Sequence, residues 1–121
     1  PYLPKNIEKE NWVVYTGTHD NATSTSWWDC LDITIKNHIK DKYKYSNDPS
    51  WNLIEIGMST KANLFISPIQ DILSLDDSSR LNTPGTITNN WRWKLNQTLD
   101  EIDMNLKKYS DLGNNYGRLS N

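Results

Sequence analysis

Two short apolar segments separated by helical sequence constrain the fold of this chain most strongly. The first, at residues 12–16, reads WVVYT, and the second, at residues 64–66, reads LFI. A continuous apolar run of this length is typical of a strand buried on both faces, as in parallel sheets. Because the sequence between them is helical, the connection is a crossover, and the two strands are predicted to pair in parallel.

The intervening sequence predicts two helices. An apolar residue recurs at every fourth position of the first predicted helix, over residues 26–43, namely at Trp27, Leu31, Ile35 and Ile39. The second is predicted over residues 50–62, where Gly57 marks either a weak point or a site of close packing. Its inward-facing side chains are Trp51, Ile54 and Met58.

The two ends of the chain carry simpler signals. Pro1 and Pro4 oppose helix formation, so residues 1–11 are predicted to be extended. Near the other end, Thr98 and Glu101 have the spacing of a capping box, which predicts a final helix that Gly113 ends.

The segment between the second strand and the final helix is less regular. Residues 69–75 fit either a strand end or a helical turn. Asp76 and Asp77 are suited to cap a short helix that ends at Leu81. A turn is predicted over residues 83–86, which read TPGT.

Two parallel strands alone make an incomplete sheet, because they leave open edges and too little surface to bury their own side chains. The order of elements is that of an α/β protein and resembles the end of a barrel of alternating strands and helices. With 121 residues, the chain is expected to form one unit over residues 1–121.

Composition excludes several classes of function. A net charge of −2 argues against a nucleic-acid partner, and no apolar run approaches the ~20 residues that span a membrane. Cys30 is the only cysteine and no signal peptide is recognisable, which favours a cytoplasmic protein. The only histidines, His19 and His38, lack ligand-like partners at suitable spacing, so no metal site and no cofactor are expected.

His19 and Asp20 are the candidate functional pair. They directly follow the first strand, and active-site residues of α/β barrels lie at the carboxyl ends of strands. A His and an Asp side by side can donate and accept hydrogen bonds to adjacent sugar hydroxyls. The alternative is that both residues only shape a turn.

Four motifs indicate a family. In order, VVYTGTHDN followed by WW, PIQDIL, RLNTPGT and NWRWKL closely resemble the C-terminal part of the amylomaltases, or 4-alpha-glucanotransferases. The resemblance extends from Pro1 to about Leu95. It implies a (β/α)₈ barrel, of which this chain is the C-terminal portion, and transfer of alpha-1,4-glucan segments with retention of configuration.

The resemblance also implies roles for individual residues. Asp20 matches a carboxylate that stabilises the transition state, and His19 matches a histidine that binds the same sugar. Asn82 matches a position near the sugar-binding cleft. Trp91 and Trp93 are interpreted as packing residues rather than as sugar platforms.

Some positions depart from the family pattern. An acidic residue is usual where Ala22 stands, glycine where Asp76 and Asn89 stand, and Met or Phe where Leu81 stands. The two lost glycines suggest altered loop conformations. The family's nucleophile and acid–base lie on earlier strands, so the chain alone is predicted to be inactive.

Two other hypotheses compete with a piece of an enzyme that acts on maltooligosaccharides or alpha-glucans. One is a free-standing carbohydrate-binding module without catalysis. The other is a truncated remnant that persists by self-association. Whatever its role, the isolated fragment has apolar strand and helix faces that need cover, and a homodimer, swapped segments or a repacked structure is expected.

Overall fold

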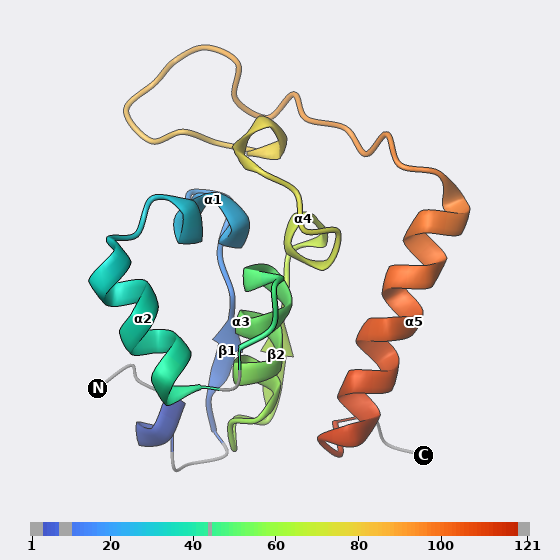
Figure 1. The fold of residues 1–121 in the computed structure, drawn as a ribbon. Coiled ribbons are helices and arrows are strands. Elements are labelled where there is room, and N and C mark those ends of the chain that lie inside the picture. The colour runs from blue at the N-terminus through green and yellow to red at the C-terminus, as the bar shows by residue number, and fades with distance from the viewer. Residues whose placement is uncertain (1–3, 8–10, 44, 119–121) are drawn as a thin grey trace.

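The computed structural model describes residues 4–7, 11–43 and 45–118, and Pro1 lies outside them. Figure 1 shows a small sheet with helices packed around it and one long helix beside this group. The elements are η1 (Pro4–Asn6), β1 (Val13–Tyr15), α1 (Ser24–Asp29), α2 (Ile33–Lys42), α3 (Pro49–Met58), β2 (Leu64–Ile66), α4 (Ile69–Ile72), η2 (Asp77–Ser79) and α5 (Leu99–Asn115). The extended lead-in was a wrong prediction at η1, because proline is compatible with the first position of a helical turn.

The parallel strand pair is confirmed. β1 and β2 pair in parallel with Val14 opposite Phe65, and they form a two-stranded sheet within the described residues. Burial on both faces is not observed. One face is covered, whereas the side chains on the other are between 49% and 54% exposed, namely Val13, Tyr15, Leu64 and Ile66.

Helix α3 forms the centre of the core, as its apolar pattern predicted. The buried cluster consists of Trp51, Ile54, Met58 and Ile72. Gly57 is a site of close packing, because a Cβ atom there would lie 2.2 Å from Cε2 of Phe65. The helix therefore meets the covered face of β2 at a position where no side chain fits.

The single helix predicted over residues 26–43 is wrong. Two helices replace it, because the Asp32 side chain accepts a 2.7 Å hydrogen bond from the Thr34 N–H and starts α2. The buried tryptophan of α1 is Trp28, at 8% exposure, rather than Trp27, at 40%. Breaking the helix changes which residues share a face.

The end of the last helix also differs from the prediction. The capping box of Thr98 and Glu101 is present, but α5 continues through the buried Gly113. Its end is a Schellman motif, in which Gly117 has φ +65° and the Arg118 N–H donates to the Gly113 carbonyl over 2.9 Å. Glycine is needed four residues later than expected.

The segments around η2 broadly follow their sequence signals, although η2 ends at Ser79 rather than at Leu81. Residues 69–72 form a helical turn, the alternative to a strand end, and Asp76 caps η2 through Ser78. The predicted turn has Gly85 at φ +82° and a hydrogen bond from the Thr86 N–H to the Thr83 carbonyl. The chain then arches from η2 to α5 along the top of Figure 1.

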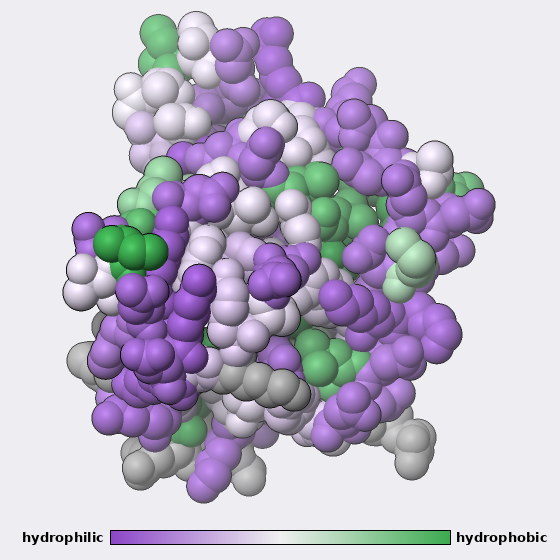
Figure 2. All heavy atoms as spheres, viewed as in Figure 1, coloured by the Kyte–Doolittle hydropathy of each residue, from purple (hydrophilic) through white to green (hydrophobic). Residues whose placement is uncertain are grey.

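Hydrophilic residues dominate the face of the molecule shown in Figure 2, and hydrophobic residues there form small separate patches. Within the described residues, no helix combines the length and the apolarity that crossing a membrane requires.

Candidate functional site

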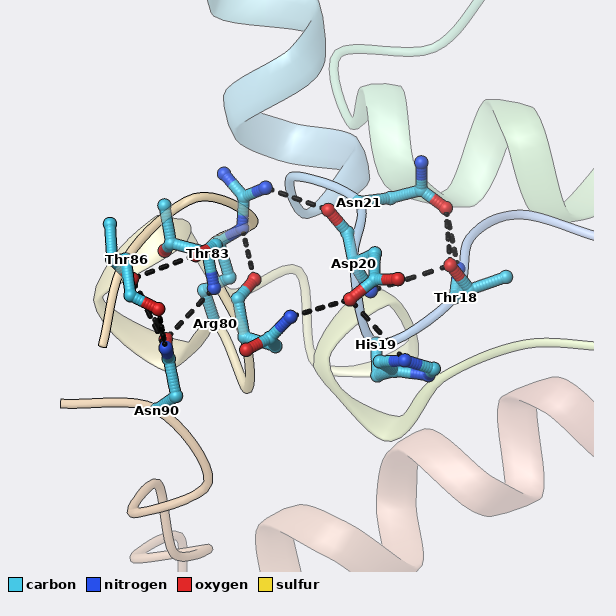
Figure 3. A network of polar contacts seen from close by, with 9 residues as sticks. Thr18, His19, Asp20, Asn21, Arg80, Thr83, Thr86 and Asn90 are labelled. Carbon is cyan, nitrogen blue, oxygen red and sulfur yellow. Dashed lines mark hydrogen bonds and ion pairs between the residues drawn. The ribbon is translucent and has the colours of Figure 1, made fainter. Parts of the chain in front are cut away.

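The loop after β1 is built by the neighbours of the His–Asp pair. Asn21 Oδ1 accepts hydrogen bonds from the Thr18 N–H over 2.8 Å and from the Thr18 hydroxyl over 2.9 Å (Figure 3). The Asn21 N–H donates to the Thr18 carbonyl over 3.1 Å. Thr18 and Asn21 thus shape the turn, and the side chains of His19 and Asp20 are available for another purpose.

The structure brings together all three site residues predicted from the sequence. Asn82 Nδ2 donates a 2.6 Å hydrogen bond to Asp20 Oδ1, although the two residues lie 62 positions apart. His19 Nε2 lies 3.3 Å from the same oxygen. The His19 and Asp20 side chains are 51% and 48% exposed. They form a polar group at the surface that has capacity for further hydrogen bonds.

Arg80 joins the two loops and was missed in the sequence. Its Nη2 donates to the Asp20 carbonyl over 2.7 Å (Figure 3). Its Nε donates to the Asn82 carbonyl over 2.9 Å. Nη1 lies 3.6 Å from Asp77 Oδ2. One guanidinium group therefore fixes the backbone of both loops, an arrangement that its five fixed donors permit.

A buried carboxylate lies behind these loops. Asp71 is 2% exposed, and its Oδ1 accepts a 2.8 Å hydrogen bond from the Ser24 N–H. Its Oδ2 accepts from the hydroxyls of Ser24 and Thr16, and its carbonyl accepts from Ser50. Asp71 thus joins the end of β1 to the starts of α1 and α3. In the sequence Asp71 stands within the apolar segment PIQDIL, and that mismatch was the available signal.

A pocket of about 110 Å³ opens between the β1 loop, α4 and Arg80. Its wall includes His19, Thr18 and Asp71. Asp20 does not line it, so the carboxylate faces the exposed side of the site. A ligand held by Asp20 would bind mainly from outside this pocket.

Hydrogen bonds of the Asn90 side chain hold the loop after Asn82 together. Asn90 Oδ1 accepts from the Thr83 N–H over 2.9 Å, and Asn90 Nδ2 donates to the Thr86 carbonyl over 3.1 Å. Asn89 has φ +61°, a conformation favoured by glycine and tolerated by asparagine. Asn89 therefore keeps the left-handed conformation although the glycine that is usual at this position is absent.

The packing role predicted for Trp91 is wrong, because its side chain is 62% exposed. Its ring centroid lies 5.0 Å from that of His19. Trp93 is of intermediate exposure, which agrees with partial packing. Trp91 thus belongs to the surroundings of the site.

The chemistry available at this site is polar recognition. Within the described part of the chain, polar contacts engage Oδ1 of the Asp20 carboxylate, which leaves Oδ2 able to accept from a ligand hydroxyl. Across the same residues, no group of three His, Cys, Asp or Glu side chains is placed to hold a metal ion. A ligand with several hydroxyl groups suits this set of donors and acceptors.

Comparison with known proteins identifies the family of this chain. The model of the 4-alpha-glucanotransferase family matches residues 1–100. The chain is 41% identical to the chloroplastic/amyloplastic 4-alpha-glucanotransferase of Arabidopsis thaliana and 42% identical to that of Solanum tuberosum. Each match covers 98% of this chain and 21% of the relative, so the chain spans about a fifth of their length.

A solved structure supports the same relationship. The chain superimposes on the amylomaltase from Streptococcus agalactiae, solved in complex with acarbose, with a TM-score of 0.83 and 25% identity. The match covers 98% of this chain and 24% of that one. Together with the family match over residues 1–100, these likenesses show that the chain belongs to the 4-alpha-glucanotransferase family.

Proposed function

We propose that this chain is the C-terminal part of the (β/α)₈ barrel of a 4-alpha-glucanotransferase, which transfers segments of maltooligosaccharides or alpha-glucans with retention. The observation that carries the proposal is the 2.6 Å hydrogen bond between Asn82 and Asp20. It unites two motifs of the family around one exposed carboxylate. The exposed face of the β1–β2 sheet fits this proposal, since the remaining strands of a barrel would cover it.

In this proposal Asp20 stabilises the transition state. A retaining reaction needs a nucleophile and an acid–base, and its transition state carries positive charge on a flattened sugar ring. Asp20 accepts hydrogen bonds from hydroxyls of that sugar, and these bonds strengthen as the charge develops. His19 and Asn82 bind the same sugar and hold the Asp20 carboxylate in position.

The chain alone is proposed to be inactive, and three of its other carboxylates serve the fold. Both oxygens of Asp71 accept hydrogen bonds in the interior. Asp48 accepts from the first N–H groups of α3 and from the Ser74 hydroxyl. Asp77 accepts from the Thr23 N–H and pairs with Arg80. None of these three is positioned as an exposed nucleophile beside Asp20.

A chimera tests the proposal. The matching segment of the Solanum tuberosum enzyme is replaced by this chain, and glucose release from maltotriose is measured. We expect transfer activity in the chimera and a loss on the order of 100- to 1000-fold in kcat for Asp20→Asn. Asp103→Asn, an exposed position on α5, is the matched control and should retain activity.

The purified chain provides the complementary test. It should release no glucose from maltotriose above the buffer rate. Activity of the chain alone would refute the claim that the nucleophile and the acid–base lie elsewhere. An active chimera that tolerates Asp20→Asn would refute the role of Asp20.

A further inference from the structure

Trp91 is an exposed aromatic residue at the edge of the proposed sugar site. Of the tryptophans, Trp28 and Trp51 are 8% and 6% exposed, whereas Trp91 is 62% exposed. Its ring is tilted by 39° relative to the His19 ring, with centroids 5.0 Å apart. A large indole is thus held at the surface beside a residue proposed to bind sugar.

The backbone of Trp91 is strained. Its φ of +60° is a conformation that bulky L-residues rarely adopt, at a cost on the order of 1–3 kcal/mol. A 2.6 Å hydrogen bond from its N–H to the Leu81 carbonyl holds it there. Leu81 precedes the site residue Asn82, so this bond ties the indole to the site. Strain of this kind is concentrated at ligand-binding positions.

A hollow of about 650 Å³ lies on the 82–92 loop. Its lining residues include Trp91 and polar residues that carry amide, hydroxyl or guanidinium groups, namely Asn82, Thr86, Thr88, Asn90 and Arg92. Asn82 and Trp91 belong both to this hollow and to the surroundings of His19 and Asp20. The hollow therefore adjoins the proposed sugar site.

We propose that Trp91 is a sugar-stacking residue, whose indole holds a second glucose unit of the glucan in this hollow. An aromatic face covers the apolar face of a pyranose, while the surrounding amides and hydroxyls bind its edge. The proposal rests on the proposed function, because His19, Asp20 and Asn82 bind the neighbouring unit. It makes the 82–92 loop a determinant of how a glucan chain is aligned.

The test is a titration of the full chain with maltohexaose, followed by NMR. The indole N–H signal of Trp91, assigned with Trp91→Phe, and the imidazole signal of His19 should shift together with one Kd. Trp91→Gly should raise that Kd about tenfold. Glycine accepts φ +60° without strain, so this variant removes the ring and keeps the loop. Trp91→Phe should retain most of the affinity.

Trp12→Leu is the matched control, since Trp12 is 36% exposed and precedes β1, at the end opposite the site. Its Kd should stay within about twofold of the parent value. A shift of the His19 signal with an unchanged Kd in Trp91→Gly would overturn the stacking role and leave the proposed function intact. A shift of Trp91 without His19 would support sugar stacking and contradict the proposed His19 site. If neither signal moves, the stacking proposal fails.

Discussion

Two aspartates with opposite surroundings mark two regions of the molecule, a structural frame around Asp71 and a candidate site around Asp20. Asp71 is 2% exposed, and both of its carboxylate oxygens accept hydrogen bonds from the ends of neighbouring elements. The Asp20 side chain is 48% exposed, and its contacts within the described residues engage Oδ1. The same type of side chain therefore has two different roles in the two regions.

The difference follows from solvation. A buried carboxylate must be fully hydrogen-bonded, so Asp71 gathers donors from Ser24 and Thr16 and becomes a structural junction. Asp20 is positioned through its backbone, because Arg80 binds its carbonyl. Its carboxylate consequently keeps capacity for a ligand. Perturbing the frame should change stability, whereas perturbing the site should change binding.

The largest effect is expected for Asp71→Ala. This change leaves the Ser24 N–H and the hydroxyls of Ser24 and Thr16 without their acceptor. The free energy of unfolding should fall by roughly 3–5 kcal/mol, measured by urea denaturation. Asp71→Asn keeps the shape and one acceptor and should lose less. Equal stability of Asp71→Ala and the parent would show that Asp71 is not a junction.

Gly57→Ala and Gly17→Ala form a matched pair across the two regions. In the frame, a Cβ at Gly57 would lie 2.2 Å from the Phe65 ring, so we expect a loss of about 1–3 kcal/mol. In the site loop, a Cβ at Gly17 would be 3.6 Å from its nearest neighbour, an ordinary contact. That variant should be neutral or slightly stabilised. Similar losses in urea unfolding of both variants would remove the contrast.

The smallest effect concerns α5, away from both aspartates. Hydrogen bonds from the backbone N–H and the hydroxyl of Thr98 lower the pKa of Glu101. Because the pKa is lower in the folded state, the stabilisation is present above the ordinary pKa of glutamate and is lost as the pH falls through the folded-state value. The stability difference between the parent and Glu101→Gln should therefore shrink progressively as the pH falls from 7 to below the ordinary pKa of glutamate. A constant difference would contradict this account.

Sequence patterns predicted the parts of the fold that depend on local chemistry. The apolar spacing of α3 and the Thr98 capping box follow from neighbouring residues, and the parallel strand pair follows from the helical connection between the strands. The break before α2 was missed, because an unbroken apolar repeat obscured the capping ability of Asp32. Burial of the open sheet face depends on elements that local sequence does not specify.

The motifs predicted the central residues of the site, but not the residues that surround and hold them. The motifs identified His19, Asp20 and Asn82, which the structure brings together. Arg80 was missed because its partners are mainly backbone carbonyls. Every residue has a backbone carbonyl, so the sequence does not indicate which of them an arginine binds. Trp91 was assigned to packing because tryptophan is usually buried, whereas here the strained loop holds it at the surface.

The central claim is that the Asp20 carboxylate serves binding and catalysis rather than folding, and urea unfolding of Asp20→Asn tests it most directly. Asparagine keeps the Oδ1 acceptor for Asn82 and the backbone contact with Arg80. The account predicts a free energy of unfolding within about 0.5 kcal/mol of the parent value. A loss of more than about 2 kcal/mol, approaching that of Asp71→Ala, would place Asp20 in the frame and contradict the account.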